Sequence, residues 1–502
     1  MEIYPMFADF FQVLLFIFLA PVLFFIFSRR IRKPGEPPLE QGWIPYLGKA
    51  LEFHKDAYKF LQAQQKKHGN IFTVHIAGRY ITYIMDPLQY GFIIRQGKQL
   101  DFQDFALSMA SRTFAYPPMI ETKFPGLSEK VHKAYQHLQG DSLNKLTESM
   151  NKNLQLVLCE KSIQETVDWR TEKLYSFCNR VMFEASFLSV YGKCQDGQRH
   201  SFIDRLKEDF NTFDKMFPYL VANVPIELLG ATKKIRKDII NIFLCKNVMK
   251  WHETSDVVRC RRDLFEEYEL RDQEKAAHHF AFLWAAMGNT LPATFWAMYY
   301  LVRNPEALAV VRDEVDHVLQ STHQEIGLGC NILLTREQLD SLVYLGSAIH
   351  ESLRMCSASM NIRVVQEDFT LRLEGDEAIS LRKKDWVALY PQSLHMDPDV
   401  YEDPEIYKFD RFVENGKEKT TFYKNGKKLR YYLMPFGSGA SMCPGRFFAV
   451  NEMKQFLFFM ITHFDMKLKE SETRVGLEYS RSGLGILFPD SDVDFQYRRR
   501  KP

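Results

Sequence analysis

The residue types best suited to chemistry gather at residues 436–446, where one cysteine stands among three glycines. Phe436, Gly439, Cys443 and Gly445 form the pattern Phe-x-x-Gly-x-x-x-Cys-x-Gly. Glycine lets the backbone approach a flat group closely, because it has no side chain and accepts unusual dihedral angles. The apolar run that follows predicts a helix, and a cysteine at a helix N-terminus is favoured as the thiolate. A thiolate held against a planar cofactor is the arrangement that ligates a haem iron.

An unpaired cysteine is by default a small buried core residue. The spacing favours another interpretation, because it resembles the haem-binding signature of the cytochrome P450 family. The resemblance implies that haem b is bound, with Cys443 as the metal ligand. It places the cofactor loop at Phe436, Gly437, Gly439 and Gly445. Ser441 departs from the family pattern, which usually has a basic residue there, so haem-propionate charge must be met elsewhere.

Residues 276–303 predict a long buried helix that is apolar on nearly every face until Gly288, Asn289 and Thr290. Pro292 removes a backbone hydrogen bond, and an opened helix leaves room for oxygen or water beside a cofactor. The alternative is a kink at Pro292 with Thr290 bonded to its own backbone. The stretch resembles the oxygen-activating helix of the family, with Asn289-Thr290 in place of an acid–threonine pair. Proton delivery is therefore expected through Asn289, Thr290 and ordered water, with these two as catalytic residues.

A carboxylate and a guanidinium lie on one helix face at Glu351 and Arg354. They resemble the Glu-x-x-Arg motif of the family, in which a second arginine, matched here by Arg411, completes the cluster. A buried ionic cluster is costly unless every donor is satisfied. These three residues are therefore expected to be structural and to hold the haem loop in place.

The resemblance also implies a substrate cavity and a propionate partner. Residues 357–363 match a cavity-lining segment, and Arg363 at its end is expected to bind a haem propionate. The alternative for Arg363 is a surface arginine that leaves a strand. Mostly apolar walls suit an apolar substrate. The expected substrate residues are Trp284, Ala286, Met287, Ser359, Met360 and Leu484.

Composition excludes several other classes of protein. The 502 residues are 46% hydrophobic and 25% charged, as in an ordinary globular protein, and no linker divides them. A net charge of +2 argues against a nucleic-acid-binding protein. Eight scattered cysteines without a Cys-x-x-Cys pair indicate neither zinc nor disulfides, which fits a reducing compartment.

The N-terminus predicts a membrane anchor. Residues 10–27 are almost wholly apolar and would span roughly 27 Å as a helix. The basic residues at 29–33 place the C-terminal bulk in the cytosol. A cleaved signal peptide is disfavoured, because acids precede the run and no Ala-x-Ala follows it. We expect an anchor at 1–33 and a haem-thiolate catalytic domain at 34–502, and the resemblance implies a single-pass protein of the endoplasmic reticulum membrane.

The elements that must position these residues are mainly helical. Residues 71–76 and 80–85 predict a hairpin, and residues 87–320 read mostly as helices. The resemblance implies the cytochrome P450 fold, mainly α with small β-sheets. Residues 417–430 carry six basic residues and one acid, either a solvated loop or a face that steers an acidic electron donor. The partner implied is NADPH–cytochrome P450 reductase, which supplies electrons from NADPH.

Within the family the chain resembles the branch of sterol 7-alpha-hydroxylases, sterol 12-alpha-hydroxylases and prostacyclin synthase, on residues 304–307, 408–412 and 434–439. Residues 225–230, 295–301, 334–342 and 488–493 favour oxysterol 7-alpha-hydroxylases, whereas 357–363 look more like cholesterol 7-alpha-hydroxylases. Hydroxylation of 25- or 27-hydroxycholesterol at the 7-alpha position, in bile acid and steroid metabolism, is the expected function. The alternatives are cholesterol 7-alpha- or sterol 12-alpha-hydroxylation. Isomerisation of a peroxide, or non-catalytic binding of haem or lipid, fits less well because Thr290 is present.

Overall fold

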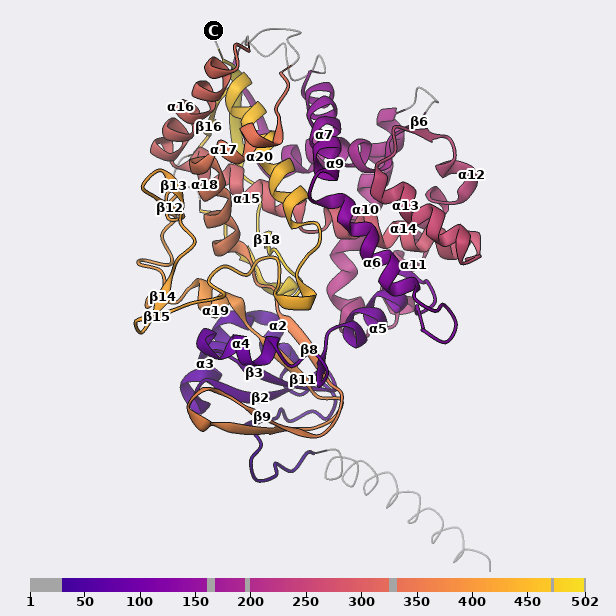
Figure 1. Ribbon diagram of the computed structural model, residues 1–502, viewed down its shortest axis with the longest axis vertical. Helices are drawn as coiled ribbons and strands as arrows, with labels where there is room; N and C mark the ends of the chain where they lie inside the picture. Colours follow the sequence, from indigo (N-terminus) through magenta and orange to yellow (C-terminus); the bar gives the residue numbers. More distant parts are fainter. Residues whose placement is uncertain (1–28, 160–167, 195–198, 325–331, 471–473, 501–502) are drawn as a thin grey trace, which may run out of the picture. The chain divides into compact units, whose positions relative to one another are not determined.

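The computed structural model describes residues 29–159, 168–194, 199–324, 332–470 and 474–500 (Figure 1). They fall into two compact units. Unit 1 contains the described residues up to 101 together with 362–390, and unit 2 contains the described residues of 102–361 and 391–502. The expected anchor segment, residues 10–27, lies outside the described residues. Among those that are described, no helix has the length and apolar character needed to cross a membrane.

Unit 1 is built on a six-stranded sheet with the order β1-β2-β3-β11-β8-β4. The predicted hairpin is confirmed, because β2 and β3 pair antiparallel with Ile71 opposite Ile84. Its turn has positive φ angles at Ala77 and Gly78. The elements of unit 1 are β1 (Leu39–Glu40), α2 (Ala50–Lys55), α3 (Ala57–His68), β2 (Ile71–Ile76), β3 (Arg79–Ile84), α4 (Tyr90–Ile94), β4 (Leu100–Asp101), β8 (Asn361–Val365), β9 (Phe369–Arg372), β10 (Ala378–Leu381) and β11 (Trp386–Leu389).

The proline-rich segment that precedes β1 is fixed to unit 1 by ion pairs. Glu36 is buried and accepts a hydrogen bond from Arg382 at 2.8 Å, and Arg30 pairs with Asp385. Burial would raise the pKa of Glu36, but the hydrogen bonds from Arg382 and from the Lys33 N–H outweigh burial and lower it to about 2. The segment therefore has a defined path across unit 1.

Unit 2 is mainly helical, as expected (Figure 1). Its long helices contribute to one large hydrophobic cluster, and two smaller clusters lie beside it. Helices α15 and α20 are buried along most of their length, because their sequences are apolar on nearly every face. The helices are α5 (Gln103–Phe114), α6 (Leu127–Ala134), α7 (Ser142–Leu158), α9 (Leu174–Tyr191), α10 (Arg199–Val221), α11 (Thr232–Ile242), α12 (Cys245–Val248), α13 (Asp256–Glu267), α14 (Asp272–Met287), α15 (Thr290–Arg303), α16 (Pro305–Ser321), α17 (Arg336–Ser341), α18 (Val343–Cys356), α19 (Pro391–His395) and α20 (Arg446–His463).

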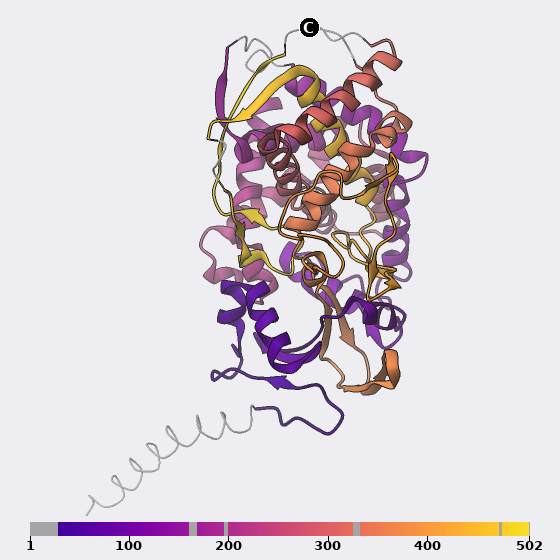
Figure 2. The same cartoon turned by 90° about the vertical axis from the view of Figure 1, so that its left-hand side faces the viewer.

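Small sheets complete unit 2, which confirms the expected mixture of helices with minor β-structure. The largest joins distant segments of the chain, since β19 lies between β16 and β5 (Figure 2). The strands are β5 (Arg170–Lys173), β6 (Lys193–Cys194), β7 (Trp251–His252), β12 (Val413–Glu414), β13 (Lys417–Glu418), β14 (Tyr423–Lys424), β15 (Lys427–Lys428), β16 (Phe464–Leu468), β17 (Leu477–Glu478), β18 (Phe488–Pro489) and β19 (Asp494–Arg499).

Candidate active site

The cysteine loop is a tight turn that presents Cys443 at the start of α20. The backbone N–H of Cys443 donates to the carbonyl of Phe436 at 2.8 Å and closes the loop. Gly437 has a φ of +77°, and a Cβ there would lie 2.9 Å from the carbonyl oxygen of Ser441. A side chain at position 437 would therefore be strained and would collide with the backbone. Ser438 is buried and donates to the Asn361 side chain at 3.1 Å, which fixes the other side of the loop.

As a residue Cys443 is half-buried, in contrast to the fully buried Cys178 and Cys356. Burial raises the pKa of the Cys443 thiol, although the Gly445 N–H and the Arg446 side chain lower it. The expected preference for the thiolate at a helix N-terminus is thus outweighed by desolvation in the protein alone. A coordinating metal deprotonates a thiol outright, so the loop provides a sulfur ligand whose proton leaves when metal binds.

The helix predicted over residues 276–303 is in fact two helices, α14 and α15, separated at Gly288 and Asn289. The interruption lies before Pro292 and is not centred on it. Proline has no N–H, so the carbonyl four residues earlier in the helix lacks its usual hydrogen-bond partner. Ala285 is exposed, and Ala281 and Asn289 are half-buried, although most of this segment is buried. Their i, i+4 spacing places them on one face. This accessible face of small side chains leaves room for the flat ring of a haem. Cys443 is a suitable ligand for the iron of that haem.

Asn289 holds a loop that carries part of the expected substrate cavity. Its Oδ1 atom accepts the backbone N–H of Ile486 at 3.0 Å. The same loop pairs with the segment after α18, where the N–H of Ala358 donates to the carbonyl of Gly485 at 2.9 Å. Ser359 forms a β-bridge with Gly483, so the structure brings Ser359, Met360, Leu484 and Asn289 together.

The expected cavity residues on α14 lie in a different setting. The Nε1 atom of Trp284 donates to Asp214 at 2.7 Å, and its ring stacks on Phe217 at 3.9 Å. Trp284 therefore packs against α10. Met287 is fully buried in the main hydrophobic core, and Ala286 is half-buried.

Thr290 begins α15 and is only 6% exposed. Glu452 on α20 is also buried, and its carboxyl group accepts a hydrogen bond from Ser186 on α9 at 2.6 Å. The threonine whose hydroxyl bonds back to its own helix is Thr294, which donates to the carbonyl of Thr290 at 2.9 Å. Glu452 was not identified from the sequence. The available signal was a single acid within the apolar run after the cysteine loop.

The structure brings Glu351, Arg354 and Arg411 into one buried cluster. Arg354 donates to Glu351 through Nε and Nη2, both at 2.8 Å, and Arg411 Nε lies 2.9 Å from Glu351 Oε1. The remaining guanidinium donors bind backbone carbonyls, including that of Pro404 at 2.7 Å and that of Glu402 at 2.7 Å. Such full use of donors is what makes a buried charge cluster tolerable.

Arg363 lies inside strand β8 of unit 1 and is 5% exposed. Its Nη1 atom donates to the carbonyl of Ile362 at 2.8 Å, and burial lowers its pKa. The alternative of a surface arginine that leaves a strand is therefore wrong.

The basic segment at residues 417–430 forms two short hairpins, β12–β13 and β14–β15. Lys424 pairs with Asp397 and is only half-exposed. The exposed basic residues of the segment are Lys417, Lys427, Lys428 and Arg430.

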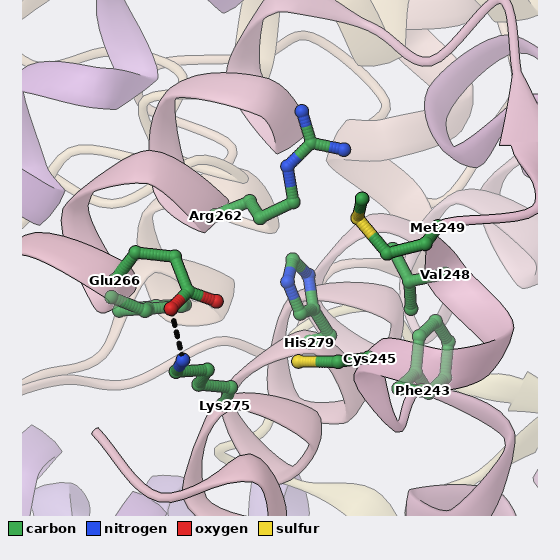
Figure 3. A pocket seen from close by; sticks show the side chains of 9 residues that line it. Phe243, Cys245, Val248, Met249, Arg262, Glu266, Lys275 and His279 are labelled. Atoms are coloured by element: carbon green, nitrogen blue, oxygen red, sulfur yellow. Dashed lines mark ion pairs between the residues drawn. The ribbon is translucent and has the colours of Figure 1, made fainter. Parts of the chain in front are cut away.

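A separate pocket of about 200 Å³ lies between α12, α13 and α14 (Figure 3). Phe243, Cys245, Met249 and His279 line it, and Lys275 pairs with Glu266 at 2.6 Å on one side. It contains none of the residues predicted for the active site. Its volume is below the roughly 300 Å³ at which cavities begin to hold drug-sized ligands.

Known proteins match this chain over nearly its whole length. A model of the cytochrome P450 family matches residues 37–493. "Cytochrome P450 7B1" of Mus musculus is 46% identical over 477 residues, 95% of this chain and 93% of the relative. "Cholesterol 7-alpha-monooxygenase" of Cricetulus griseus is 43% identical over 94% of this chain and 95% of its own. "25-hydroxycholesterol 7-alpha-hydroxylase" of Rattus norvegicus is 42% identical over 82% of this chain and 99% of its own. These matches show that the chain, with Cys443 just before α20, belongs to the cytochrome P450 family, whose cofactor is a haem held by a cysteine thiolate.

Proposed function

We propose that this protein is a haem-thiolate monooxygenase that hydroxylates a sterol at the 7-alpha position, using dioxygen and electrons from NADPH. The observation that carries the proposal is the similarity, over 94% of this chain, to a relative named as a cholesterol 7-alpha-monooxygenase. The arrangement of Cys443 at the start of α20 supports it. The iron–porphyrin, when bound, supplies dioxygen activation and electron transfer.

The residues of this chain hold and orient the reacting groups. Cys443 provides the sulfur ligand, and the loop formed by Phe436, Gly437, Gly439 and Gly445 keeps that sulfur in place. Arg363 is proposed to neutralise a propionate, which would offset the serine at position 441. Glu351, Arg354 and Arg411 stabilise the segment beneath the loop.

On the substrate side, Thr290 supplies a hydroxyl proton at the opened helix, and Asn289 orders the loop beside it. Ser359, Met360 and Leu484 form one wall of the sterol cavity, and Ala286 contributes from α14, where Trp284 and Met287 instead pack against α10 and the hydrophobic core. Mostly apolar walls exclude water and favour a steroid skeleton.

We propose oxysterols such as 25- or 27-hydroxycholesterol as the preferred substrates. A relative named for 25-hydroxycholesterol supports this choice at 42% identity, and one named for cholesterol supports the alternative at 43%. The 12-alpha position is the other alternative. A prostacyclin-synthase-like isomerase needs no oxygen-activating threonine, and the presence of Thr290 argues against that activity.

Residues 1–33 are proposed as a single-pass anchor in the endoplasmic reticulum membrane, with the catalytic domain at 34–502 facing the cytosol. The exposed side chains of Lys417, Lys427, Lys428 and Arg430 suit an acidic electron-donor domain such as that of NADPH–cytochrome P450 reductase.

The test offers cholesterol and 25-hydroxycholesterol together, in equal amounts, to the full-length protein with reductase and NADPH. Mass spectrometry against authentic standards should find 7-alpha-hydroxylated products, mainly from 25-hydroxycholesterol. Hydroxylation elsewhere on the ring would overturn the positional assignment. A product that forms without reductase would favour an isomerase.

A further inference from the structure

A buried ion pair joins helix α10 to the segment that follows β17. Asp214 on α10 is 3% exposed, and Arg481 is 2% exposed. Arg481 Nη1 lies 3.0 Å from Asp214 Oδ2 and donates to the carbonyl of Asp214 at 3.1 Å. Among the described residues, the Nε and Nη2 atoms of Arg481 have no hydrogen-bond partner. Asp214 therefore supplies the acceptors that compensate this buried charge, which would be costly without them.

The other carboxylate oxygen of Asp214 holds the indole of Trp284. Trp284 Nε1 on α14 donates to Asp214 Oδ1 at 2.7 Å. The indole also stacks on Phe217, which lies three residues after Asp214 on the same face of α10. The same ring lies against Gly288, where a Cβ would come within 3.3 Å of the indole nitrogen. Trp284 thus connects α10 to the interruption between α14 and α15.

Arg481 begins the loop that carries part of the expected sterol cavity. The N–H of Leu484 donates to the carbonyl of Arg481 at 3.1 Å. Two residues further on, the N–H of Ile486 donates to Asn289 at the helix interruption at 3.0 Å. Asp214 is therefore connected to this loop through one carboxylate oxygen and to the helix interruption through the other.

We propose that Asp214 is a positioning residue for sterol binding, which holds α10, the helix interruption and the loop that carries Leu484 in one arrangement. The proposal deepens the sterol hydroxylase function proposed above and rests on it. The carboxylate acts through Trp284 and Arg481 and not by contact with the reacting atoms. Both partners lie outside the cysteine loop, so loss of the carboxylate should weaken sterol binding and leave the haem site intact.

The test measures the dissociation constant of 25-hydroxycholesterol from the sterol-induced change in the haem absorption spectrum of the full-length protein. Asp214→Asn keeps an oxygen that can accept from Trp284 but loses the charge that compensates Arg481. We expect about tenfold weaker sterol binding and a similarly raised KM with reductase. The kcat at saturating sterol should change by less than about twofold, because the interaction is lost equally in the ground and transition states. Haem content and the carbon monoxide spectrum should not change.

A smaller change at the other partner provides a second variant. Trp284→Phe retains an aromatic ring for the stack on Phe217 and removes the N–H donor to Asp214. It should weaken sterol binding by about threefold, as expected for the loss of one hydrogen bond. Asp316→Asn is the control, because Asp316 on α16 forms a two-pronged ion pair with Arg500 at 2.6 and 2.8 Å and contacts none of the expected cavity residues there. It should leave sterol affinity unchanged.

A double variant separates positioning of the loop from a general loss of stability. Gly485→Ala displaces the same loop, because a Cβ at position 485 would lie 2.2 Å from Asn289 Oδ1. If Asp214 acts through the loop, Asp214→Asn combined with Gly485→Ala should bind sterol about as weakly as the weaker single variant. Independent effects would multiply instead.

Unchanged sterol affinity in haem-loaded Asp214→Asn would overturn the proposal, and so would multiplying effects in the double variant. If Asp214→Asn does not fold, Trp284→Phe decides, since full sterol affinity in that variant would also overturn the proposal. Failure of the proposed function would look different. The unmodified protein would then show no sterol-induced spectral change and form no reductase-dependent hydroxysterol.

Discussion

The Nε2 atom of His395 accepts the backbone N–H of Met434 at 3.0 Å. The carbonyl of His395 accepts a hydrogen bond from Arg354, the centre of the buried charge cluster. His395 thus connects the cluster of Glu351, Arg354 and Arg411 to the segment that leads into the cysteine loop. The cluster and the segment before the cysteine loop are therefore joined by hydrogen bonds through His395.

Replacing His395 by Ala should loosen the cysteine loop. The buried N–H of Met434 would lose its acceptor, at a cost of about 1–3 kcal/mol in the free energy of unfolding. Urea unfolding and the haem content of the purified protein measure the two effects. His317→Ala, at an exposed histidine, is the control and should change neither. Unchanged haem content and stability in His395→Ala would show that the connection is unimportant.

His395 should also make stability depend on pH. Burial, aided by Arg354, lowers its pKa from 6.5 to about 3, so between these values the unfolded chain binds a proton that the folded chain does not. Its contribution to stability is therefore complete above about pH 6.5 and declines as the pH falls, by up to about 1.4 kcal/mol per pH unit. Urea unfolding at a series of pH values should give a smaller slope for His395→Gln. An identical slope would mean that His395 is not the titrating group.

The charge cluster should be far more sensitive than surface ion pairs. Arg354→Ala leaves Glu351 without its partner inside the core and should cost about 3–5 kcal/mol. Arg354→Lys should be only a partial rescue, because lysine cannot reproduce the two-pronged contact. Lys133→Ala removes an exposed pair with Glu129 and should cost less than about 1 kcal/mol. Equal costs for the buried and exposed substitutions, measured by urea unfolding, would contradict this role.

The contact between Asn289 and the 483–486 loop should control sterol binding. A Cβ at position 485 would lie 2.2 Å from Asn289 Oδ1, so Gly485→Ala must displace the loop that carries Leu484. We expect at least about tenfold weaker sterol binding, read from the sterol-induced change in the haem absorption spectrum. Gly69→Ala is the control for backbone strain, because Gly69 has a φ of +86° and a ψ of −165° that favour glycine, but its Cβ would meet nothing within 4 Å. Equal loss of affinity in both variants would attribute the effect to strain alone.

Local patterns in the sequence predicted the hairpin of unit 1, the helical character of unit 2 and the cysteine loop. Each depends on neighbouring residues: alternating β-formers for the hairpin, and glycines around Cys443 for the loop. The sequence predicted the position of the helix break less well. Pro292 removes the hydrogen bond to a carbonyl one turn earlier, so the break lies before the proline.

Glu452 and His395 could not be assigned from local patterns. Their partners, Ser186 and Met434, lie far away in the sequence and are brought close only by the tertiary fold. Ser441 shows the same limit, since no neighbouring residue indicates what replaces a basic side chain at that position. Contacts that form only in the tertiary structure do not produce a recognisable spacing of residues in the sequence.

The most direct test is the carbon monoxide difference spectrum of the reduced protein. It is compared between the unmodified chain and Cys443→Ser. Cys245→Ser is the control, because Cys245 lies in the separate pocket of Figure 3. We expect the spectrum characteristic of a thiolate-bound haem in the unmodified protein and in Cys245→Ser, and its loss in Cys443→Ser. A thiolate-type spectrum that survives in Cys443→Ser would contradict the assignment of Cys443 as the ligand.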